Sequence, residues 1–427
     1  MNAPRRVQSV TSLSGALRVP GDKSTSHRAL MISALASGTS TIEGLSPGED
    51  VKSTSRIIEQ LGAKRSDDLG VITIIGPDSG LRASDAELDC GNSGTTMRLL
   101  CGVVSGIEGT HRLIGDASLS KRPMDRVAAP LGLMGAVISG GGHRVNAPLE
   151  VTGTSSLRGI DYRVPTPSAQ VKSAILLAGL HAAGDTTVRE DIRTRTTTED
   201  MLRSAGVDVS SVDQELGRVV SLTPQRPKAH NWRVPGDPSQ AAFFCVLGAI
   251  HANAHIEVLD IDVAPERTGF ISVLQRMGAQ VDASSREGRG IVTVKSSQLT
   301  STEINSREIP SVDEVPILAV AAAAARGVTV FRDMGELRIK ESDRFKGSMM
   351  LASLVGCRVW SEGDDFFIDG LSSAEAFSSF SIDAGLDHRI VMSAAVAGLA
   401  GSGCSILGAE TVASSYPTFF EDVASLS

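Results

Sequence analysis

VPGDKSTSHRAL, residues 19–30, has a shortened copy in VPGDPSQAA, residues 234–242. In both stretches a Val-Pro pair, which favours extended backbone, leads into a Gly-Asp turn and then into an apolar run typical of a helix. Only the first copy continues with cations, at Lys23 and Arg28, whereas the second has Pro238 and Gln240. We interpret the copies as two crossings of the chain between domains, and we expect only the first crossing to have a binding function.

A long internal repeat accompanies the duplicated turn. A helix-type segment that ends at a glycine and precedes a short β-type run recurs at steps of about 72 residues. A second, alanine-rich family of helices interleaves with the first. Gly or Asn at such a break suits the left-handed residue that ends a helix, and β-branched residues after it suit a strand. The breaks of the first family are Gly62, Gly135, Gly206, Gly278 and Gly356; those of the second are Gly38, Gly109, Gly184, Asn253, Gly327 and Gly403.

These breaks predict an α/β protein of six repeats, of which the last is cut short. At 427 residues the chain is also too long for one ordinary core. We therefore expect two domains of three repeats each. Residues 21–234 would form one domain, and residues 1–20 together with 235–427 would form the other.

The composition excludes several classes of protein. The formal net charge of −8 and the aromatic content of 4% disfavour binding to nucleic acid, which needs a basic face or stacking platforms. The five dispersed cysteines form no C-x-x-C pair, which favours a reducing compartment over disulfides or zinc. The first residues, MNAPRRVQSV, contain no apolar stretch, and no apolar run reaches the ~20 residues that a membrane helix needs. We expect a cytoplasmic protein.

Cations stand at the predicted starts of the alanine-rich helices, where acidic residues would suit the helix dipole better. Four of them, Lys23, Arg28, Arg98 and Lys172, make sense if an anion binds there. Further cations follow on loops or element ends: Lys121, Arg122, Arg126, Arg338, Lys340, Arg344 and Arg389. The chain has no Walker A motif and no G-x-G-x-x-G after a strand. The pattern predicts a small, multiply anionic ligand rather than a nucleotide.

Seven motifs carry these cations in order from residue 20 to about residue 395. They read PGDKSTSHRAL, CGNSGTTMRLL, GDASLSKRPMDR, PTPSAQVKSAILLAGL, VDEVPILAVAAAAARG, LRIKESDRF and DHRIVMSAAV. Together they resemble the motifs of the 5-enolpyruvylshikimate-3-phosphate (EPSP) synthase family, the 3-phosphoshikimate 1-carboxyvinyltransferases. The resemblance implies the enolpyruvyl-transferase fold: six βαβαββ repeats, three per domain, with a hinge and an interdomain cleft.

The resemblance also implies a reaction. The carboxyvinyl group of phosphoenolpyruvate would pass to the 5-hydroxyl of 3-phosphoshikimate with release of phosphate, in the shikimate pathway to chorismate and the aromatic amino acids. It implies small-molecule substrates alone, no metal or organic cofactor, no nucleic acid or membrane partner, and a target of glyphosate. We also expect a monomer.

The same resemblance implies roles for individual residues. The 3-phosphoshikimate side would comprise Lys23, Ser24, Arg28, Ser168, Ala169, Gln170, Arg195, Asp313 and Lys340. The phosphoenolpyruvate side would comprise Lys23, Gly94, Arg122, Gln170, Arg344 and Arg389. Asp313 would take the proton of the 5-hydroxyl, and Glu341 would handle the proton at the methylene carbon. Addition to an enol ether needs such a base and such an acid, and Lys23 completes the catalytic set.

Some of these residues have plainer interpretations. By sequence alone, Asp313 is a helix cap before EVPILAV, and Glu341 is an exposed partner of Arg344 at i,i+3. We expect His27 to be a packed residue without a catalytic role.

The chain also departs from the family pattern in places. Ala169 stands where some members have a second serine, so its contact would come from the backbone, and Leu99 replaces a frequent proline. Ser414 and Ser415 stand where some members have a lysine. The small Gly94 is expected of a glyphosate-sensitive site, while Leu99 leaves the response to glyphosate open.

The sequence leaves two alternatives to the EPSP synthase reaction open. A UDP-N-acetylglucosamine enolpyruvyl transferase would share the fold, but it typically has Lys-Asn where this chain has Lys23-Ser24, and a reactive loop cysteine. Cys90 and Cys101 lie in apolar, helix-like context and do not resemble that nucleophile. A non-catalytic anion-binding repeat protein would need no second carboxylate such as Asp313 or Glu341 in its pocket.

Overall fold

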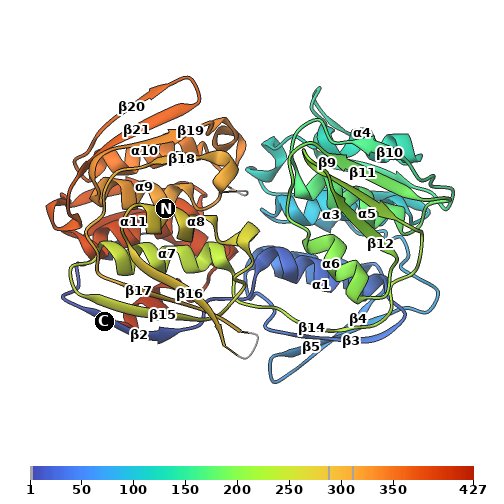
Figure 1. Cartoon of the computed structure of the whole chain (residues 1–427). Helices are drawn as coiled ribbons and strands as arrows, with labels where there is room; N and C mark the ends of the chain where they lie inside the picture. Colours follow the sequence, from blue (N-terminus) through green and yellow to red (C-terminus); the bar gives the residue numbers. More distant parts are fainter. Residues whose placement is uncertain (1–2, 287–288, 310–311) are drawn as a thin grey trace. The chain divides into compact units, whose positions relative to one another are not determined.

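The computed structural model describes residues 3–286, 289–309 and 312–427. The chain divides into two compact units, Gly21–Val234 and the pair of segments Met1–Pro20 and Pro235–Ser427 (Figure 1). Both divisions fall inside the Val-Pro-Gly-Asp copies. In each copy the aspartate caps a helix: Oδ1 of Asp22 accepts the N–H of Thr25, and Oδ1 of Asp237 accepts the N–H of Ser239. The repeated tetrapeptide is therefore a repeated helix start.

Gly21–Val234 contains three inner helices, three outer helices and three four-stranded sheets. The inner helices are α1 (Lys23–Leu35), α3 (Gly94–Ser105) and α5 (Ala169–Gly179); the outer ones are α2 (Glu49–Gln60), α4 (Asp125–Met134) and α6 (Thr197–Ser204). The strands, in sheet order, are β14 (Asn231–Arg233), β3 (Gly38–Glu43), β5 (Val71–Gly76), β4 (Lys64–Asp68); β6 (Leu88–Asp89), β7 (Gly109–Ile114), β9 (Asn146–Gly153), β8 (Val137–Gly141); and β10 (Asp161–Arg163), β11 (Thr186–Glu190), β13 (Arg218–Leu222), β12 (Val209–Asp213).

The other unit follows the same plan. Its inner helices are α7 (Pro238–Ile250), α9 (Val315–Ala324) and α11 (His388–Ala400), its outer ones α8 (Gly269–Arg276) and α10 (Arg344–Leu354), and α12 (Phe419–Ala424) ends the chain. Its strands, in sheet order, are β16 (Gln280–Arg286), β17 (Arg289–Lys295), β15 (Ala254–Ile261), β2 (Leu13–Leu17); β18 (Glu303–Asn305), β19 (Arg326–Arg332), β21 (Asp365–Leu371), β20 (Arg358–Glu362); and β1 (Arg5–Val7), β23 (Cys404–Leu407), β22 (Phe380–Asp383).

The strand pairing is the same in every four-stranded sheet: one parallel pair joined to an antiparallel hairpin. The three-stranded sheet keeps the parallel pair β22–β23, and β1 pairs antiparallel with β23 in place of the hairpin. The sixth repeat is thus the short one, as the sequence predicted.

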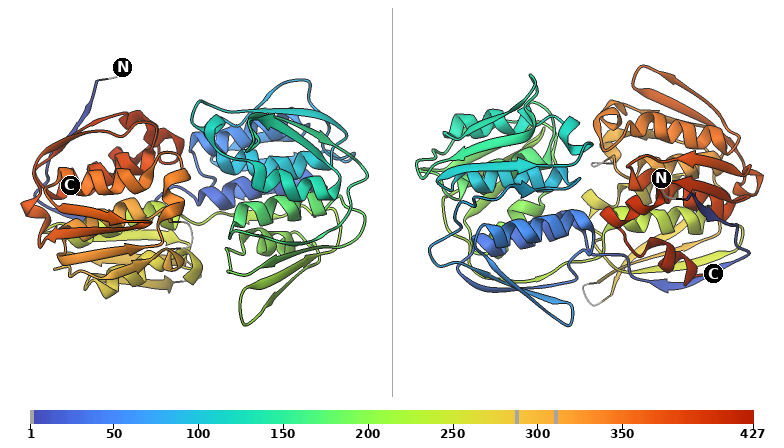
Figure 2. Two further views of the ribbon diagram at one scale, coloured as in Figure 1. Left: turned by 90° about the horizontal axis from the view of Figure 1, so that it is seen from above. Right: turned by 180° about the vertical axis from the view of Figure 1, so that it is seen from behind.

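The inner helices form the core of each unit. In the unit that ends the chain, α7, α9 and α11 pack against one another (Figure 2). Every residue of these three helices is buried. The sequence VPILAVAAAA of α9 is apolar on all sides, as expected of a helix with no solvent-facing stripe. Each unit has its own hydrophobic core. No helix in the described part of the chain is long and apolar enough to span a membrane.

The predicted breaks prove to be of two kinds. All five glycines of the first family have φ between 76° and 114°, and they follow the outer helices as left-handed caps. The second family was assigned the same role, and its five glycines do have positive φ, between 81° and 120°. Their assignment to the helix end is wrong. Ala36, His251 and Ala325 end α1, α7 and α9 in extended backbone, and the break comes two residues later, near the start of the next strand. Asn253, unlike the five glycines, is outside the left-handed region.

Candidate active site

The first turns of α3 and α5 meet through hydrogen bonds between side chains. Nη1 of Arg98 donates to Oε1 of Gln170 at 2.7 Å, and Nε2 of Gln170 donates to Oγ1 of Thr95 at 2.9 Å. A methyl group added to Gly94, the first residue of α3, would lie 2.9 Å from Nη1 of Arg98 and 3.2 Å from Nη1 of Arg122. Two guanidinium groups therefore lie at a helix N-terminus, which is a favourable place for an anion.

The start of α1 is joined to its neighbours by Lys23 and Arg28. Nζ of Lys23 lies 3.0 Å from Oδ2 of Asp50, in the first turn of α2. The buried Arg28 donates from Nη1 to the carbonyl of Ser24, from Nη2 to Oγ of Ser173 at 2.7 Å, and from Nε to Oγ1 of Thr198 at 2.6 Å. One guanidinium thus fixes α1 against α5 and α6.

The remaining predicted residues of this unit lie on α5 and before α6. Ser168 is the N-cap of α5, its Oγ accepting the N–H of Val171, and Ala169 is the first residue of that helix. Arg195 is half-buried in the segment between β11 and α6. The interpretation of His27 as a packed residue is confirmed: it is buried, its Nδ1 lies 2.8 Å from Oγ1 of Thr54, and burial above all lowers the pKa of its ring.

The expectation that Lys172 needs a bound anion is wrong. Its side chain is 0% exposed, and Nζ lies 2.8 Å from Oε2 of Glu190 and 2.7 Å from Oε1 of Glu199. The sequence showed the helix position but not the acidic partners, which come from β11 and α6. Arg28, Arg98 and Arg122 likewise donate to protein oxygens.

In the other unit a second cluster forms around Arg344, the first residue of α10. Its Nη1 lies 2.9 Å from Oδ1 of Asp313, its Nη2 lies 2.7 Å from Oε2 of Glu341, and its Nε lies 2.8 Å from Oδ2 of Asp387. Nη2 of Arg389, on α11, lies 3.4 Å from Oδ2 of Asp313. The structure therefore brings together four of the predicted residues of this unit: Asp313, Glu341, Arg344 and Arg389. The fifth, Lys340, forms an ion pair with Glu336, with Nζ 2.8 Å from Oε1.

Charge governs the ionisation of this cluster. Burial would raise the pKa of Asp313, but Arg389, Arg344 and Lys340 outweigh it and hold that pKa below its usual range. Burial likewise opposes ionisation of Asp387, yet Arg344 and His388 keep its pKa low. The carboxylates in turn raise the pKa of Arg344 against the effect of burial. Asp313 is consequently ionised at neutral pH and can act as a proton acceptor.

The backbone before Asp313 is strained. Val312 has φ 49°, a left-handed conformation that costs a β-branched residue about 1–3 kcal/mol. Sequence reasoning did not select this residue, nor Asp387. Asp387 could have been identified from the sequence as the N-cap of α11, because it directly precedes His388 and Arg389.

The structure also shows the surroundings of Ser414 and of the two cysteines Cys90 and Cys101. Oγ of Ser414 lies 3.1 Å from Nδ1 of His388 and donates to the carbonyl of Thr411 at 2.8 Å. Cys90 and Cys101 are buried. Burial raises the pKa of Cys90 well above its usual value and that of Cys101 to about 12, so neither thiol ionises at neutral pH. Among the described residues, no group of three or more His, Cys, Asp or Glu side chains is placed to hold a metal ion.

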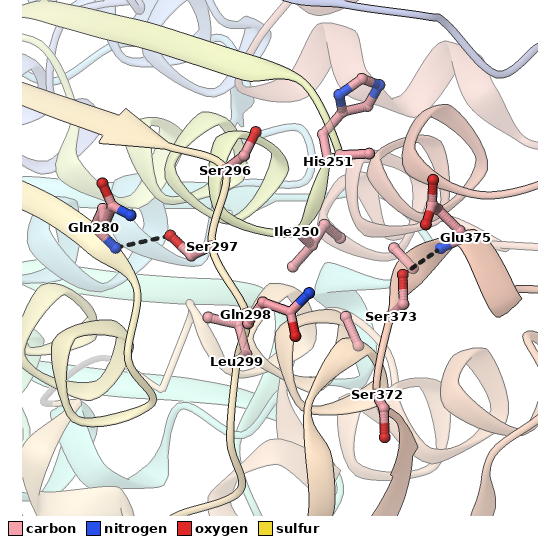
Figure 3. A pocket seen from close by; sticks show the side chains of 13 residues that line it. Ile250, His251, Gln280, Ser296, Ser297, Gln298, Leu299, Ser372, Ser373 and Glu375 are labelled. Carbon is pink, nitrogen blue, oxygen red and sulfur yellow. Dashed lines mark hydrogen bonds between the residues drawn. The ribbon is translucent and has the colours of Figure 1, made fainter.

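A cavity of about 300 Å³ lies elsewhere in the unit that ends the chain (Figure 3). Ile250 and Ala324, the last residues of α7 and α9, line it together with Gln298, Ser373 and Glu375. None of the predicted site residues lines this cavity. It therefore belongs to the C-terminal ends of the inner helices, whereas the candidate residues lie at or near helix N-termini.

Known proteins resemble the chain over its whole length. The family model for EPSP synthase (3-phosphoshikimate 1-carboxyvinyltransferase) matches residues 7–423. A protein named 3-phosphoshikimate 1-carboxyvinyltransferase from Synechococcus sp. (strain WH7803) is 43% identical, with 99% of this chain and 98% of that protein covered. One of the same name from Bacillus thuringiensis subsp. konkukian (strain 97-27) is 41% identical, with 99% of each covered.

Solved structures agree with these relatives. An EPSP synthase from Acinetobacter baumannii superposes with a TM-score of 0.85 at 38% identity, covering 100% of this chain and 98% of that one. The enolpyruvyl transferase NikO from Streptomyces tendae shares the fold, with a TM-score of 0.78 at 20% identity and the same coverage. The fold of the chain is that of the enolpyruvyl-transferase class. Within that class the chain belongs to the EPSP synthase family, so the resemblance inferred from its motifs is confirmed.

Proposed function

We propose that the chain catalyses the reaction that its family name describes. It transfers the carboxyvinyl group of phosphoenolpyruvate to the 5-hydroxyl of 3-phosphoshikimate and releases phosphate, as a biosynthetic step of the shikimate pathway. Membership of the family over residues 7–423 supports this proposal. The observation that carries it is the Arg344 cluster, where a guanidinium lies between Asp313 and Glu341, the two carboxylates that the reaction needs.

The cationic helix starts of Gly21–Val234 suit the two anionic substrates. We assign the 3-phosphate side to residues around α1, α5 and α6, where Arg28 is already oriented by Ser173 and Thr198. Ala169 contributes through its backbone N–H, because the first N–H groups of a helix have no partner within the helix. The 3-phosphate residues are Lys23, Ser24, Arg28, Ser168, Ala169, Gln170 and Arg195; Lys23, Gly94, Arg122 and Gln170 take the phosphoenolpyruvate side.

The Arg344 cluster suits proton transfer. Asp313 takes the proton of the 5-hydroxyl while that oxygen bonds to C2 of phosphoenolpyruvate, and Glu341 gives a proton to C3, which becomes a methyl group. In the second step C3 returns a proton as the C2–O bond to phosphate breaks. Arg344 and Arg389 bind the substrate carboxylate and phosphate, and Lys340 binds shikimate oxygens.

The ion pairs suggest how Asp313 becomes an effective base. A substrate anion that binds Arg344 and Arg389 competes with Asp313 for the same guanidinium groups. Weaker pairing, together with the charge of the anion, raises the pKa of Asp313 toward the operating pH, where a general base works best. Substrate binding and base activation are therefore coupled through Arg344.

We also propose that the two units are domains joined at a hinge and that both act on one pair of substrates. Each unit contains part of the candidate set, Arg28 and its partners in one and the Arg344 cluster in the other, which supports this proposal. Small-angle scattering with both ligands should report a smaller radius of gyration; an unchanged radius would count against closure. The five buried thiols, none in a disulfide, support a cytoplasmic location, and we propose a monomer.

Phosphate release tests the proposed reaction. Wild-type protein should release phosphate only when 3-phosphoshikimate and phosphoenolpyruvate are both present. Release with UDP-N-acetylglucosamine instead would favour the rival transferase, which the neutral Cys90 and Cys101 already disfavour. Binding of both anions without phosphate release would indicate a non-catalytic protein.

A further inference from the structure

Lys172 forms the most deeply buried ion-pair cluster among the described residues of Gly21–Val234. Its side chain and that of Glu199 are 0% exposed, and that of Glu190 is 2% exposed. Burial of charged groups carries a large desolvation penalty, so such a cluster is weak support for stability by itself. Since Nζ has no exposed surface, Lys172 cannot meet a ligand directly in this conformation.

The two carboxylates lie next to residues of the proposed 3-phosphoshikimate side. Glu199 directly follows Thr198, whose Oγ1 accepts the Nε–H of Arg28. Glu190, the last residue of β11, also accepts a hydrogen bond from Oγ1 of Thr194 through its Oε1 atom. Thr194 directly precedes Arg195. Glu199 is therefore linked to Arg28 through Thr198, and Glu190 is linked to Arg195 through Thr194. Both arginines belong to the proposed 3-phosphoshikimate side.

Lys172 itself belongs to the third element of that side. It lies on α5 two residues after Gln170, and Ser173, the next residue, accepts a hydrogen bond from Nη2 of Arg28. The ammonium group thus joins α5 to the end of β11 and to the first turn of α6.

We propose that Lys172 is a positioning residue for 3-phosphoshikimate. By holding Glu190 and Glu199, it sets the 190–199 segment against α5 and thereby fixes Arg28 and Arg195 at the spacing that the ligand's phosphate requires. This inference rests on the proposed function. It predicts that loss of the cluster weakens 3-phosphoshikimate binding specifically, because phosphoenolpyruvate is assigned to Gly94 and Arg122.

The test uses a variant that removes the three charges together, Lys172→Met with Glu190→Gln and Glu199→Gln, so that no buried charge is left unpaired. Titration calorimetry should find the Kd for 3-phosphoshikimate raised about 10- to 100-fold, the size expected for a misplaced binding group. The KM for phosphoenolpyruvate should stay within about threefold of wild type. The control is Val151→Ala, in the core strand β9, which lowers stability without contacting this cluster.

A mutant cycle separates positioning from stability. In an Arg28→Ala, Arg195→Ala background the triple change should have little further effect on the Kd, because residues that act through one another are not additive. Equal weakening in both backgrounds, or a wild-type Kd in the folded triple variant, would overturn the inference. If the triple variant does not fold, Thr194→Val breaks the link to Arg195 without burying a charge, and it should raise the same Kd severalfold; an unchanged Kd overturns the inference. Normal turnover by the wild type in that case leaves the proposed function intact.

Discussion

Nη1 of Arg344 lies 2.9 Å from Oδ1 of Asp313, yet the Arg344 side chain is 1% exposed and that of Asp313 is 27% exposed. The Arg344 guanidinium also donates two hydrogen bonds to Asp387, from Nε to Oδ2 at 2.8 Å and from Nη2 to Oδ1 at 3.2 Å. Arg344 is thus fixed in place, while its partner Asp313 has access to solvent. This arrangement suits a base that is released when an anion takes its place at the arginine.

Replacement of the base is the first prediction. Asp313→Asn should lower kcat about 10²- to 10⁴-fold, the usual contribution of a general base. The change keeps the shape of the side chain, so calorimetry should find 3-phosphoshikimate bound within a few-fold of wild type. A variant with near-normal kcat would remove Asp313 from the proposed mechanism.

Asp387 should make stability depend on pH. Its pKa is lower in the folded state than in the unfolded chain, where Asp has a pKa of about 3.9. Its contribution is therefore present above that value and is lost as the pH falls through the folded pKa. Urea unfolding from pH 7 to pH 3 should find Asp387→Asn less stable at pH 7 and less sensitive to acid. Glu303→Gln, which removes an exposed partner of Arg332, is the control and should behave like wild type.

Gly94 should discriminate between phosphoenolpyruvate and its analogues. In Gly94→Ala the added methyl group would press on Arg98 at 2.9 Å and Arg122 at 3.2 Å. We expect a higher KM for phosphoenolpyruvate and weaker inhibition by glyphosate, with little change in the Kd for 3-phosphoshikimate. Gly132→Ala in α4 is the matched control, because its methyl group would meet no atom within 4 Å apart from the adjoining residues and backbone of its own helix. Equal kinetics in both variants would refute the assignment of Gly94.

Lys23 distinguishes binding from folding at the start of α1. Lys23→Met should abolish turnover while the circular dichroism spectrum stays close to wild type; the unfolding midpoint should fall, because the largely buried Asp50 loses this ion pair. Lys52→Met, which removes an exposed lysine paired with Glu49 in the neighbouring helix α2, should retain full activity. Retained turnover in Lys23→Met would contradict the role given to this lysine.

Local signals explain what the sequence could predict. Five of the six inner helices begin at a Ser or Asp whose side chain caps the helix, and α9 is the exception. The glycines after the outer helices adopt the left-handed backbone expected of them. Asn253 was misassigned because an extended residue ends α7, so the break belongs to the following strand. The alternation of polar and apolar residues alone does not show whether a break lies at the end of a helix or at the start of the next strand.

Charge pairing between distant elements could not be predicted in the same way. Lys172 resembled an anion ligand because its helix position is visible in the sequence, whereas its partners Glu190 and Glu199 come from a strand and another helix. The pairing of Arg344 with Asp387 likewise joins α10 to the cap of α11. The motifs identified most of the candidate residues. Only the structure shows which of the cations form ion pairs with carboxylates of the protein.

Addition followed by elimination can be tested by running the reaction in D₂O and following the products by nuclear magnetic resonance. Addition followed by elimination makes C3 of phosphoenolpyruvate a methyl group for part of the cycle, with a proton supplied through Glu341. We expect phosphate together with an enolpyruvyl ether at the 5-oxygen, whose methylene carries deuterium. Phosphate without that ether, or an ether whose methylene contains no deuterium, would contradict this expectation.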